Sequence, residues 1–377
     1  GNIIGSNGDG SGDAFERNVI SGNGSNGIWI SGSGSFGNIV AGNYIGVSAD
    51  GSTAVGNANH GVLIDDSAYA NTIGGDDAAE RNVISGNTVN AIQINGEDSD
   101  GNIIQGNYIG VSADGSTNLD NNQNTGSAIY ITVGADNTQV LDNLIVGARY
   151  AGIELDAGHV NDGTVIQGNI IGTDATGTQN WGVGESGILI EQATNTTIGG
   201  TGAGEGNTVA YSGRVDAQWG VGVAIQDGGT GNTVRGNAIY ANSANGIDLA
   251  PTVIDGPTPN DAGDIDTGAN NFQNWAVLTS VGIADDGTFS YELDTTTLAA
   301  GLYTIDFYAS SSRDGGIVEG ERYLGTLSGV ANGNSSLTGT LSSITLSPYE
   351  YVTLTATDAS GNTSEFSNYA VAVRSDA

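Results

Sequence analysis

A perfect internal repeat limits this chain to a small set of folds. Residues 17–23 return unchanged as residues 81–87, and residues 42–53 return unchanged as residues 106–117. In both cases the shift is 64 residues, from 17 to 81 and from 42 to 106. A fixed period indicates one structural unit stacked on itself, so the sequence predicts a solenoid over the first two thirds of the chain.

Three short apolar patterns recur in a fixed order within each unit. The shortest copy consists of three predicted strands of about three or four residues, separated by Gly, Asn and small polar turns. These strands are residues 232–234, 236–239 and 246–249. The third pattern recurs at residues 27–30, 61–64, 91–94, 128–131, 152–155, 187–190, 222–225 and 246–249. Its inward positions are always Val, Ile or Leu, whereas its middle position varies as an outward position does. We therefore expect eight coils whose strands pair in parallel, about 4.8 Å apart, as three sheets around an aliphatic core.

Asparagines head many of these strands and favour a structural interpretation. A Gly-Asn pair suits a sharp corner with positive φ, and a side-chain amide can bond to equivalent amides in the coils above and below. The sequence predicts such stacks for Asn38, Asn43, Asn102, Asn107, Asn143, Asn169, Asn232 and Asn237.

The recurring signatures Asn-x-Ile, Gly-Asn-x-Ile and Gly-Ile-x-Ile resemble the right-handed parallel β-helix repeats of large bacterial surface and secreted proteins. The resemblance covers roughly residues 1–249. It implies a right-handed parallel β-helix of about eight coils and three sheets. It says little about activity, because the same fold carries pectate and alginate lyases, polygalacturonases, epimerases, phage tailspikes and adhesins.

The period stops after residue 250, and the composition changes. Residues 251–271 are rich in Pro, Gly, Asp and Asn and predict a linker, while residues 272–377 alternate Thr, Tyr, Val and Leu between Gly-containing turns. Residues 320–325 and 355–367 resemble the Ig-like module that often follows such repeats. The expected fold class is therefore all-β, a β-helix over 1–250 and an Ig-like antiparallel β-sandwich over 272–377 that caps the last coil.

The amino-acid composition limits the kinds of molecule that the protein can bind. The chain carries 42 acidic and 8 basic residues, for a formal charge of −34, and it has no Cys. This balance excludes nucleic acid and anionic membrane surfaces as natural partners, and it favours divalent cations. No apolar run is long enough for membrane insertion. We expect a secreted or bacterial cell-surface protein, and a chain that begins inside a repeat reads as a processed product or a fragment.

The best metal candidate is the acidic run in the linker. Asp261, Asp264 and Asp266 flank Gly263, where the chain can turn, and carboxylates with backbone carbonyls are the ligands that Ca²⁺ prefers. The spacing matches a calcium loop only in part, because the full EF-hand pattern and its bidentate Glu are missing. The alternative is an acidic linker without an ion.

Two further groups of residues are candidates for function. Arg149, Tyr150 and His159 lie in one coil with short loops. In a lyase acting on uronate sugars, Arg149 could supply the cation, Tyr150 the acid and His159 the base. The simpler interpretation is that they are ordinary surface residues. Trp29, Leu63 and Tyr130 occupy the outward position of the third strand and would form a binding surface for sugar rings or protein, unless loops cover it.

The sequence favours a non-catalytic structural or adhesive protein with bound Ca²⁺. Because the first coil has no cap, end-to-end self-assembly into a homopolymer is one hypothesis, and a surface glycan or protein is the other partner expected. A polysaccharide lyase or epimerase acting on an acidic glycan is the first alternative, and a glycan-binding module is the second.

Overall fold

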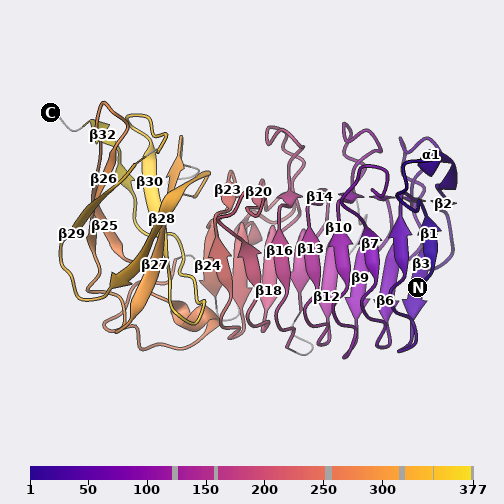
Figure 1. Cartoon of the computed structure of the whole chain (residues 1–377), viewed down its shortest axis with the longest axis horizontal. Helices are drawn as coiled ribbons and strands as arrows, with labels where there is room; N and C mark the ends of the chain where they lie inside the picture. The colour runs from indigo at the N-terminus through magenta and orange to yellow at the C-terminus, as the bar shows by residue number, and fades with distance from the viewer. Residues whose placement is uncertain (121–125, 157–159, 251–256, 314–318, 343, 375–377) are drawn as a thin grey trace.

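The fold was analysed in a computed structural model of the chain, which describes residues 1–120, 126–156, 160–250, 257–313, 319–342 and 344–374. A long stack of short parallel strands fills the N-terminal two thirds, and two larger sheets close its C-terminal end (Figure 1). The predicted fold class, a parallel β-helix followed by a β-sandwich, is confirmed. None of the helices in these residues has the length and apolarity needed to cross a membrane.

Each coil of the β-helix contributes one strand to each of three parallel eight-stranded sheets. The first sheet contains β1 (Ile3–Gly5), β4 (Ile39–Ala41), β7 (Thr72–Gly74), β10 (Ile103–Gln105), β13 (Gln139–Leu141), β16 (Val165–Gln167), β19 (Thr197–Gly199) and β22 (Thr233–Arg235). The second contains β2 (Val19–Ile20), β5 (Tyr44–Ile45), β8 (Val83–Ile84), β11 (Tyr108–Ile109), β14 (Leu144–Ile145), β17 (Ile170–Ile171), β20 (Thr208–Ala210) and β23 (Ala238–Tyr240). The third contains β3 (Ile28–Ser31), β6 (Val62–Asp65), β9 (Ile92–Asn95), β12 (Ile129–Thr132), β15 (Ile153–Leu155), β18 (Ile188–Glu191), β21 (Val223–Gln226) and β24 (Ile247–Ala250).

The C-terminal part is a sandwich of two four-stranded sheets, antiparallel except for one short parallel pairing between β25 and β32. One sheet orders β29 (Leu337–Leu341), β26 (Phe289–Asp294), β25 (Val277–Ile283) and β32 (Val373–Arg374). The other orders β28 (Arg322–Ala331), β27 (Leu302–Ser310), β30 (Tyr351–Thr357) and β31 (Ala370–Val371). The helical segments are short: α1 (Asp13–Glu16), η1 (Ala217–Trp219) and η2 (Ala269–Phe272).

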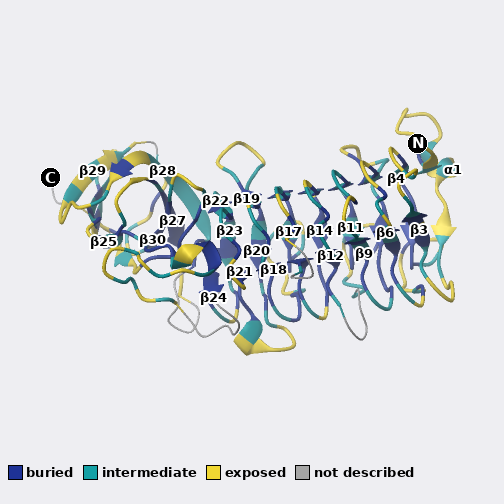
Figure 2. Ribbon diagram, turned by 90° about the horizontal axis from the view of Figure 1, so that it is seen from below, coloured by how far each residue is buried: buried dark blue, intermediate teal, exposed yellow. Residues whose placement is uncertain are grey.

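The alternation within each strand builds the core. In the third sheet Ile92, Ile129 and Ile153 stand opposite one another in register and are fully buried, and their equivalents in the first and last coils are at most 7% exposed. Figure 2 shows this buried interior running through the coils, with exposed residues gathered in the loops and at α1. One continuous aliphatic cluster therefore extends from the first coil to the last.

Asparagine ladders fix the corners of the coils, as the sequence predicted for seven of the eight residues named. The amide of the eighth, Asn232, donates instead to the Ala193 carbonyl at 2.9 Å. In the longest ladder the amide of each Asn bonds to the Oδ1 of the next, at 2.9–3.2 Å. Its members are Asn18, Asn43, Asn82, Asn107, Asn143, Asn169, Asn207 and Asn237. A shorter ladder joins Asn2, Asn38, Asn71 and Asn102. Where a Gly precedes the Asn, the corner can be especially tight: Gly106 has φ +68°, and a Cβ there would lie 2.2 Å from the carbonyl oxygen of Gly75.

The sandwich takes the place of a ninth coil. Groups of the eighth coil that would otherwise bond to a following coil bond instead to oxygens of the sandwich or of the segment before it. These contacts are Val234 N to Thr363 Oγ1 (3.0 Å), Ile239 N to Gly320 O (2.8 Å), Leu249 N to Glu365 Oε1 (2.9 Å), Asn232 N to Asn270 Oδ1 (3.0 Å) and Asn242 Nδ2 to Glu319 Oε1 (2.9 Å). The strand edges of all three sheets are thus closed by matched acceptors.

Side chains complete this junction. Arg235, at the end of β22, forms a two-pronged ion pair with the buried Asp306 of β27, with N–O distances of 2.5 and 2.9 Å. Tyr308 and Phe366 pack edge to face, with ring centroids 5.3 Å apart, and join the β-helix core cluster. The sandwich is therefore bound to the rod by apolar packing as well as by hydrogen bonds.

Removing one interior rung of the longest ladder should destabilise the rod strongly. The Asn107 amide donates to Ile73 O (2.8 Å), Gln105 O (3.0 Å) and Asn143 Oδ1 (3.0 Å). Asn107→Ala leaves these buried acceptors without that donor, so we expect a loss of about 3–5 kcal/mol in the free energy of unfolding, measured by urea denaturation. Asn2→Ala, at the exposed first rung of the shorter ladder, is the control and should cost less than about 1 kcal/mol. Equal losses at the two positions would contradict a ladder stabilised by burial.

Candidate functional site

The outward column of the third sheet carries the predicted binding surface. Trp29 pairs in register with Leu63, and Gln93 with Tyr130, so these side chains face outward in successive coils. Trp29 is 63% exposed and its indole donates to Asp65 Oδ1 at 2.8 Å, whereas Leu63 and Tyr130 are half-buried. The column continues through Glu154 and Leu189, so the aromatic surface leads directly into an acidic one.

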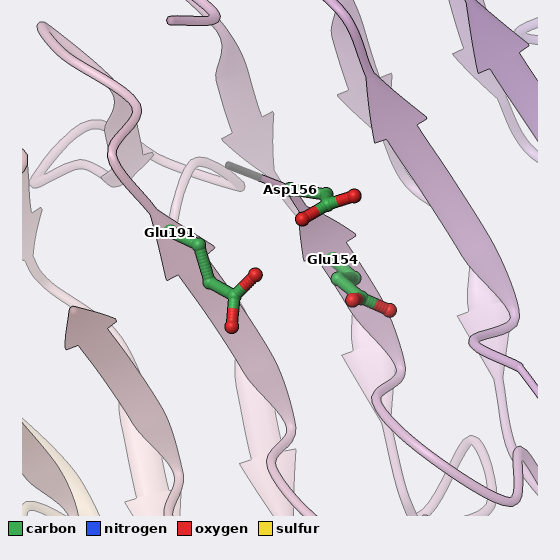
Figure 3. Close-up of side chains that lie close together, drawn as sticks. All are labelled: Glu154, Asp156 and Glu191. Carbon is green, nitrogen blue, oxygen red and sulfur yellow. The ribbon is translucent and has the colours of Figure 1, made fainter. Parts of the chain in front are cut away.

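Three carboxylates meet on this face at the fifth and sixth coils. Glu154 lies in β15, Asp156 follows that strand directly, and Glu191 ends β18 (Figure 3). One oxygen from each lies within 4.8 Å of the others, close enough for the three to share a ligand. Because β15 and β18 pair in register, with Leu155 opposite Ile190, their following positions bring Asp156 beside Glu191.

Hydroxyl groups from the preceding coil hold two of these carboxylates. Ser127 Oγ donates to Glu154 Oε2 and accepts a hydrogen bond from Ala151 N at 3.2 Å. Tyr130 Oη donates to Asp156 Oδ2, and Tyr130 lies opposite Glu154 in the β12–β15 pairing. The two carboxylates are therefore held by Tyr130 of β12 and by Ser127 just before that strand, which favours a fixed arrangement.

Glu154 has an unusually high pKa for a carboxyl group. Its side chain is only 8% exposed, and burial, together with the charges of Glu191, Asp156 and Glu185, raises its pKa to about 7 against the hydrogen bond from Ser127. An apolar cluster of Leu189, Ala224, Ala151 and Val221, with Tyr150 and Trp219 packed on it, lies beside it on this face. Glu154 therefore exchanges its proton near neutral pH.

The residues proposed from sequence as a catalytic group are only partly brought together. Tyr150 is half-buried, and burial followed by the charges of Glu185, Glu154, Glu191 and Asp156 raises its pKa to about 12, so its hydroxyl stays protonated beside the cluster. Arg149 is exposed and lowers the pKa of Glu185, against the effects of burial and Asp216. His159 lies outside the described residues.

The linker acids also come together, as expected from the sequence. Asp261, Asp264 and Asp266 each place a carboxylate oxygen within 4.8 Å of the others. Asn274 fixes the loop, because its backbone N–H donates to Asp264 Oδ1 at 2.9 Å and its amide donates to the Asp261 carbonyl at 2.9 Å. Burial, with the charges of Asp266 and Asp261, raises the pKa of Asp264 to about 6. Acidic clusters that can hold a metal ion are therefore present at two places.

The linker cluster opens onto a hollow between the loop and the sandwich. A pocket of about 520 Å³ is lined by Asp264 and Asp266 on one side and by Leu302, Tyr303 and Asp358 on the other. Within the described part of the chain, the buried Oδ1 of Asp266 finds no hydrogen-bond partner. A buried carboxylate oxygen without a donor is costly, and an oxygen-binding cation would relieve it.

Chemically, the two clusters offer different possibilities. Among the described residues both clusters present only oxygen ligands, which suit a hard divalent cation. The Glu154 cluster also combines a carboxyl that is half-protonated near neutral pH with two further carboxylates, the elements of proton transfer. Sequence reasoning named Arg149 and Tyr150 from the fifth coil but missed Glu191 in the sixth. The signal was available one position beyond the Gly-Ile-x-Ile signature, where acids stand in adjacent coils.

Comparison with known proteins leaves the chain without a family assignment. Family models give no match to the chain, and no curated protein matches its sequence. The fold and its acidic clusters define the class: an all-β protein in which a parallel β-helix is closed by a β-sandwich. The function of the chain therefore has to be inferred from the two acidic clusters.

Neutralising Glu154 should stabilise the protein at alkaline pH. A carboxyl whose folded pKa, about 7, exceeds its unfolded value of 4.5 favours folding fully below pH 4.5 and loses that contribution as pH rises through 7. At pH 8, Glu154→Gln should raise the free energy of unfolding by about 3 kcal/mol, and the gain should vanish near pH 4. Urea denaturation between pH 4 and pH 8 measures this change in the free energy of unfolding. Asp227→Asn, at an exposed site, is the control. A gain independent of pH would refute the shifted pKa.

Proposed function

We propose that this chain is a calcium-binding structural or adhesive module of a secreted or bacterial cell-surface protein. The observation that carries the proposal is the linker cluster, in which Asp261, Asp264 and Asp266 converge around a buried oxygen of Asp266 that has no donor among the described residues. The cluster lies in the segment that joins the rod to the sandwich. An ion there would stabilise the link between them.

The donor set favours calcium among the common cations. The three side chains supply carboxylate oxygens without a His or Cys ligand, which disfavours zinc and copper. The neighbouring pocket leaves room for water or further oxygen ligands around an ion, and Ca²⁺ accepts six to eight oxygens in flexible geometry, whereas Mg²⁺ demands a near-ideal octahedron. When bound, the ion would neutralise the mutual repulsion of the three aspartates.

The rest of the fold suits a mechanical role. A continuous core and the asparagine ladder that runs from Asn18 to Asn237 make the rod a single stacked body, and the sandwich closes one end. Self-assembly, if it occurs through strand edges, would have to use β1, β2 and β3, because the edge at β22, β23 and β24 is already covered. A glycan or protein ligand would instead meet the exposed Trp29 on the third sheet.

Calcium should bind and stabilise the protein through the linker cluster. We expect a calorimetric binding signal for wild type and a rise in melting temperature with calcium, with a stabilisation of about 2.7 kcal/mol at a hundred times Kd. The Asp264→Asn/Asp266→Asn variant should lose this linker-site signal. Asp76→Asn/Asp77→Asn removes two exposed carboxylates elsewhere and should retain it.

A second acidic cluster is present, so Glu154→Gln/Glu191→Gln is measured in parallel. Binding that disappears only in this variant would move the calcium site to the outer face of the rod. No binding in wild type would remove the calcium proposal.

The protonation of Glu154 favours one second candidate, a polysaccharide lyase or epimerase acting on an acidic glycan. A carboxyl with a pKa about 7 can take a proton from a uronate C5 as the base and return one as the acid. Asp156 and Glu191 could bind the cation that offsets the substrate carboxylate on a chain of charge −34. Tyr150 keeps its proton, because burial and the charges of the same carboxylates raise the pKa of its hydroxyl.

This candidate predicts turnover that depends on Glu154. Uronate polysaccharides are incubated with calcium, and new unsaturated ends or inverted C5 centres are followed by ultraviolet absorbance and NMR. Glu154→Gln should lower the rate by about a hundredfold or more, because it removes the group that exchanges the proton. Asp227→Asn should leave the rate unchanged. Absence of turnover across the substrates favours the structural role.

A further inference from the structure

The junction between rod and sandwich contains two buried carboxyl groups. Asp248 belongs to β24, the last strand of the third sheet, and is 0% exposed. Glu365 belongs to the segment that follows β30 and is 2% exposed. One acid thus comes from each side of the junction: Glu365 bonds to the backbone N–H of Leu249, the neighbour of Asp248, and the two carboxyl groups interact.

Glu365 also carries backbone contacts that dock the sandwich. Its Oε1 accepts from Leu249 N at 2.9 Å, and its Oε2 accepts from Thr258 N at 2.7 Å. Thr258 in turn donates through its hydroxyl to the Leu249 carbonyl at 3.2 Å. Glu365 therefore acts as the acceptor that a ninth coil would have provided, while it lies against the carboxyl of Asp248.

Two carboxyl groups that interact closely and out of water cannot both be ionised without strong repulsion. One proton shared between them gives a hydrogen bond across the junction instead. We propose that Asp248 and Glu365 form a proton-dependent latch, which holds the sandwich on the last coil while the pair keeps one proton and releases it when that proton is lost at alkaline pH.

Among the described residues, Asp248 is the charged group that acts most strongly on Glu365. Opposite Asp248 in the sheet stands Ala224 of β21, and η2, which packs near β24, carries no ionisable side chain. Elsewhere at the junction, Arg235 is paired with Asp306, and Glu319 accepts from the Asn242 amide. Burial and then the charge of Asp248 raise the pKa of Glu365 well above its usual range, against the backbone donors that lower it.

The raised pKa of Glu365 determines how docking of the sandwich depends on pH. Undocking returns both carboxyls to water, where they ionise in the ordinary acidic range. The docked state therefore binds more protons than the undocked state at neutral and mildly alkaline pH. The undocking constant should rise by up to tenfold per pH unit in this window and level off once the docked pair is fully ionised. The latch therefore holds the sandwich firmly until the pH at which the docked pair loses its shared proton.

Thiol labelling can measure undocking directly, because the chain has no native Cys. Val234→Cys places one thiol at a buried position of the last coil, whose backbone N–H bonds to Thr363 Oγ1 of the sandwich. Labelling rates between pH 6 and pH 9 are corrected for thiolate content with a peptide of the same local sequence. In this background the corrected rate should rise with pH, by up to tenfold per unit.

Asp248→Asn separates the latch from general charge repulsion. An amide donates to Glu365 without a titrating proton, so the corrected rate should become nearly independent of pH. Asp227→Asn removes one exposed carboxylate from the end of β21 and should keep the wild-type slope. Calorimetric melting of the same variants without the added Cys provides a second reading, in which only Asp248→Asn should gain stability towards pH 9. An identical slope in wild type and Asp248→Asn, by both methods, would overturn the latch.

Discussion

Hydrogen bonding between successive coils is the constraint on which this structure depends. Each coil leaves N–H and C=O groups that only the next coil can satisfy, and the asparagine amides extend the same dependence to the corners. A stack of this kind has no natural end. The sandwich provides one by presenting acceptors such as Thr363, Gly320 and Glu365 in the register of a further coil. Its attachment is therefore part of the β-helix hydrogen-bond network, and a change at the junction affects the edge of every sheet.

The same register determines where chemistry can occur. Outward positions form columns whose members stand one strand spacing apart, so a carboxylate in one coil meets only neighbours within a coil or two. Glu154, Asp156 and Glu191 satisfy this condition and share a burial that favours protonation. Asp248 lies in the same column as Glu154 but three coils away, and its close acidic neighbour comes from the sandwich instead.

Much of the architecture could be predicted because it repeats. The Gly-Ile-x-Ile signature predicted the third sheet and its inward residues, and Gly-Asn pairs such as Gly106-Asn107 predicted the ladder corners. The convergence of Asp261, Asp264 and Asp266 was predicted because the three are close in sequence. Contacts that join distant segments could not be predicted in this way. Glu365 follows no period, so nothing in its local sequence indicates that it bonds to Leu249 and interacts with Asp248.

The two acidic features at the junction are linked through one short segment. Thr258 donates to Glu365, and Asp261, three residues later, begins the cluster that could hold calcium. A cation at that cluster would fix the backbone that supplies the Thr258 donor, and this donor favours the ionised form of Glu365. Calcium would thus oppose the release that loss of the shared proton promotes. A protein of charge −34 would then keep its cap most firmly where calcium is plentiful, the condition that a module outside the cell meets.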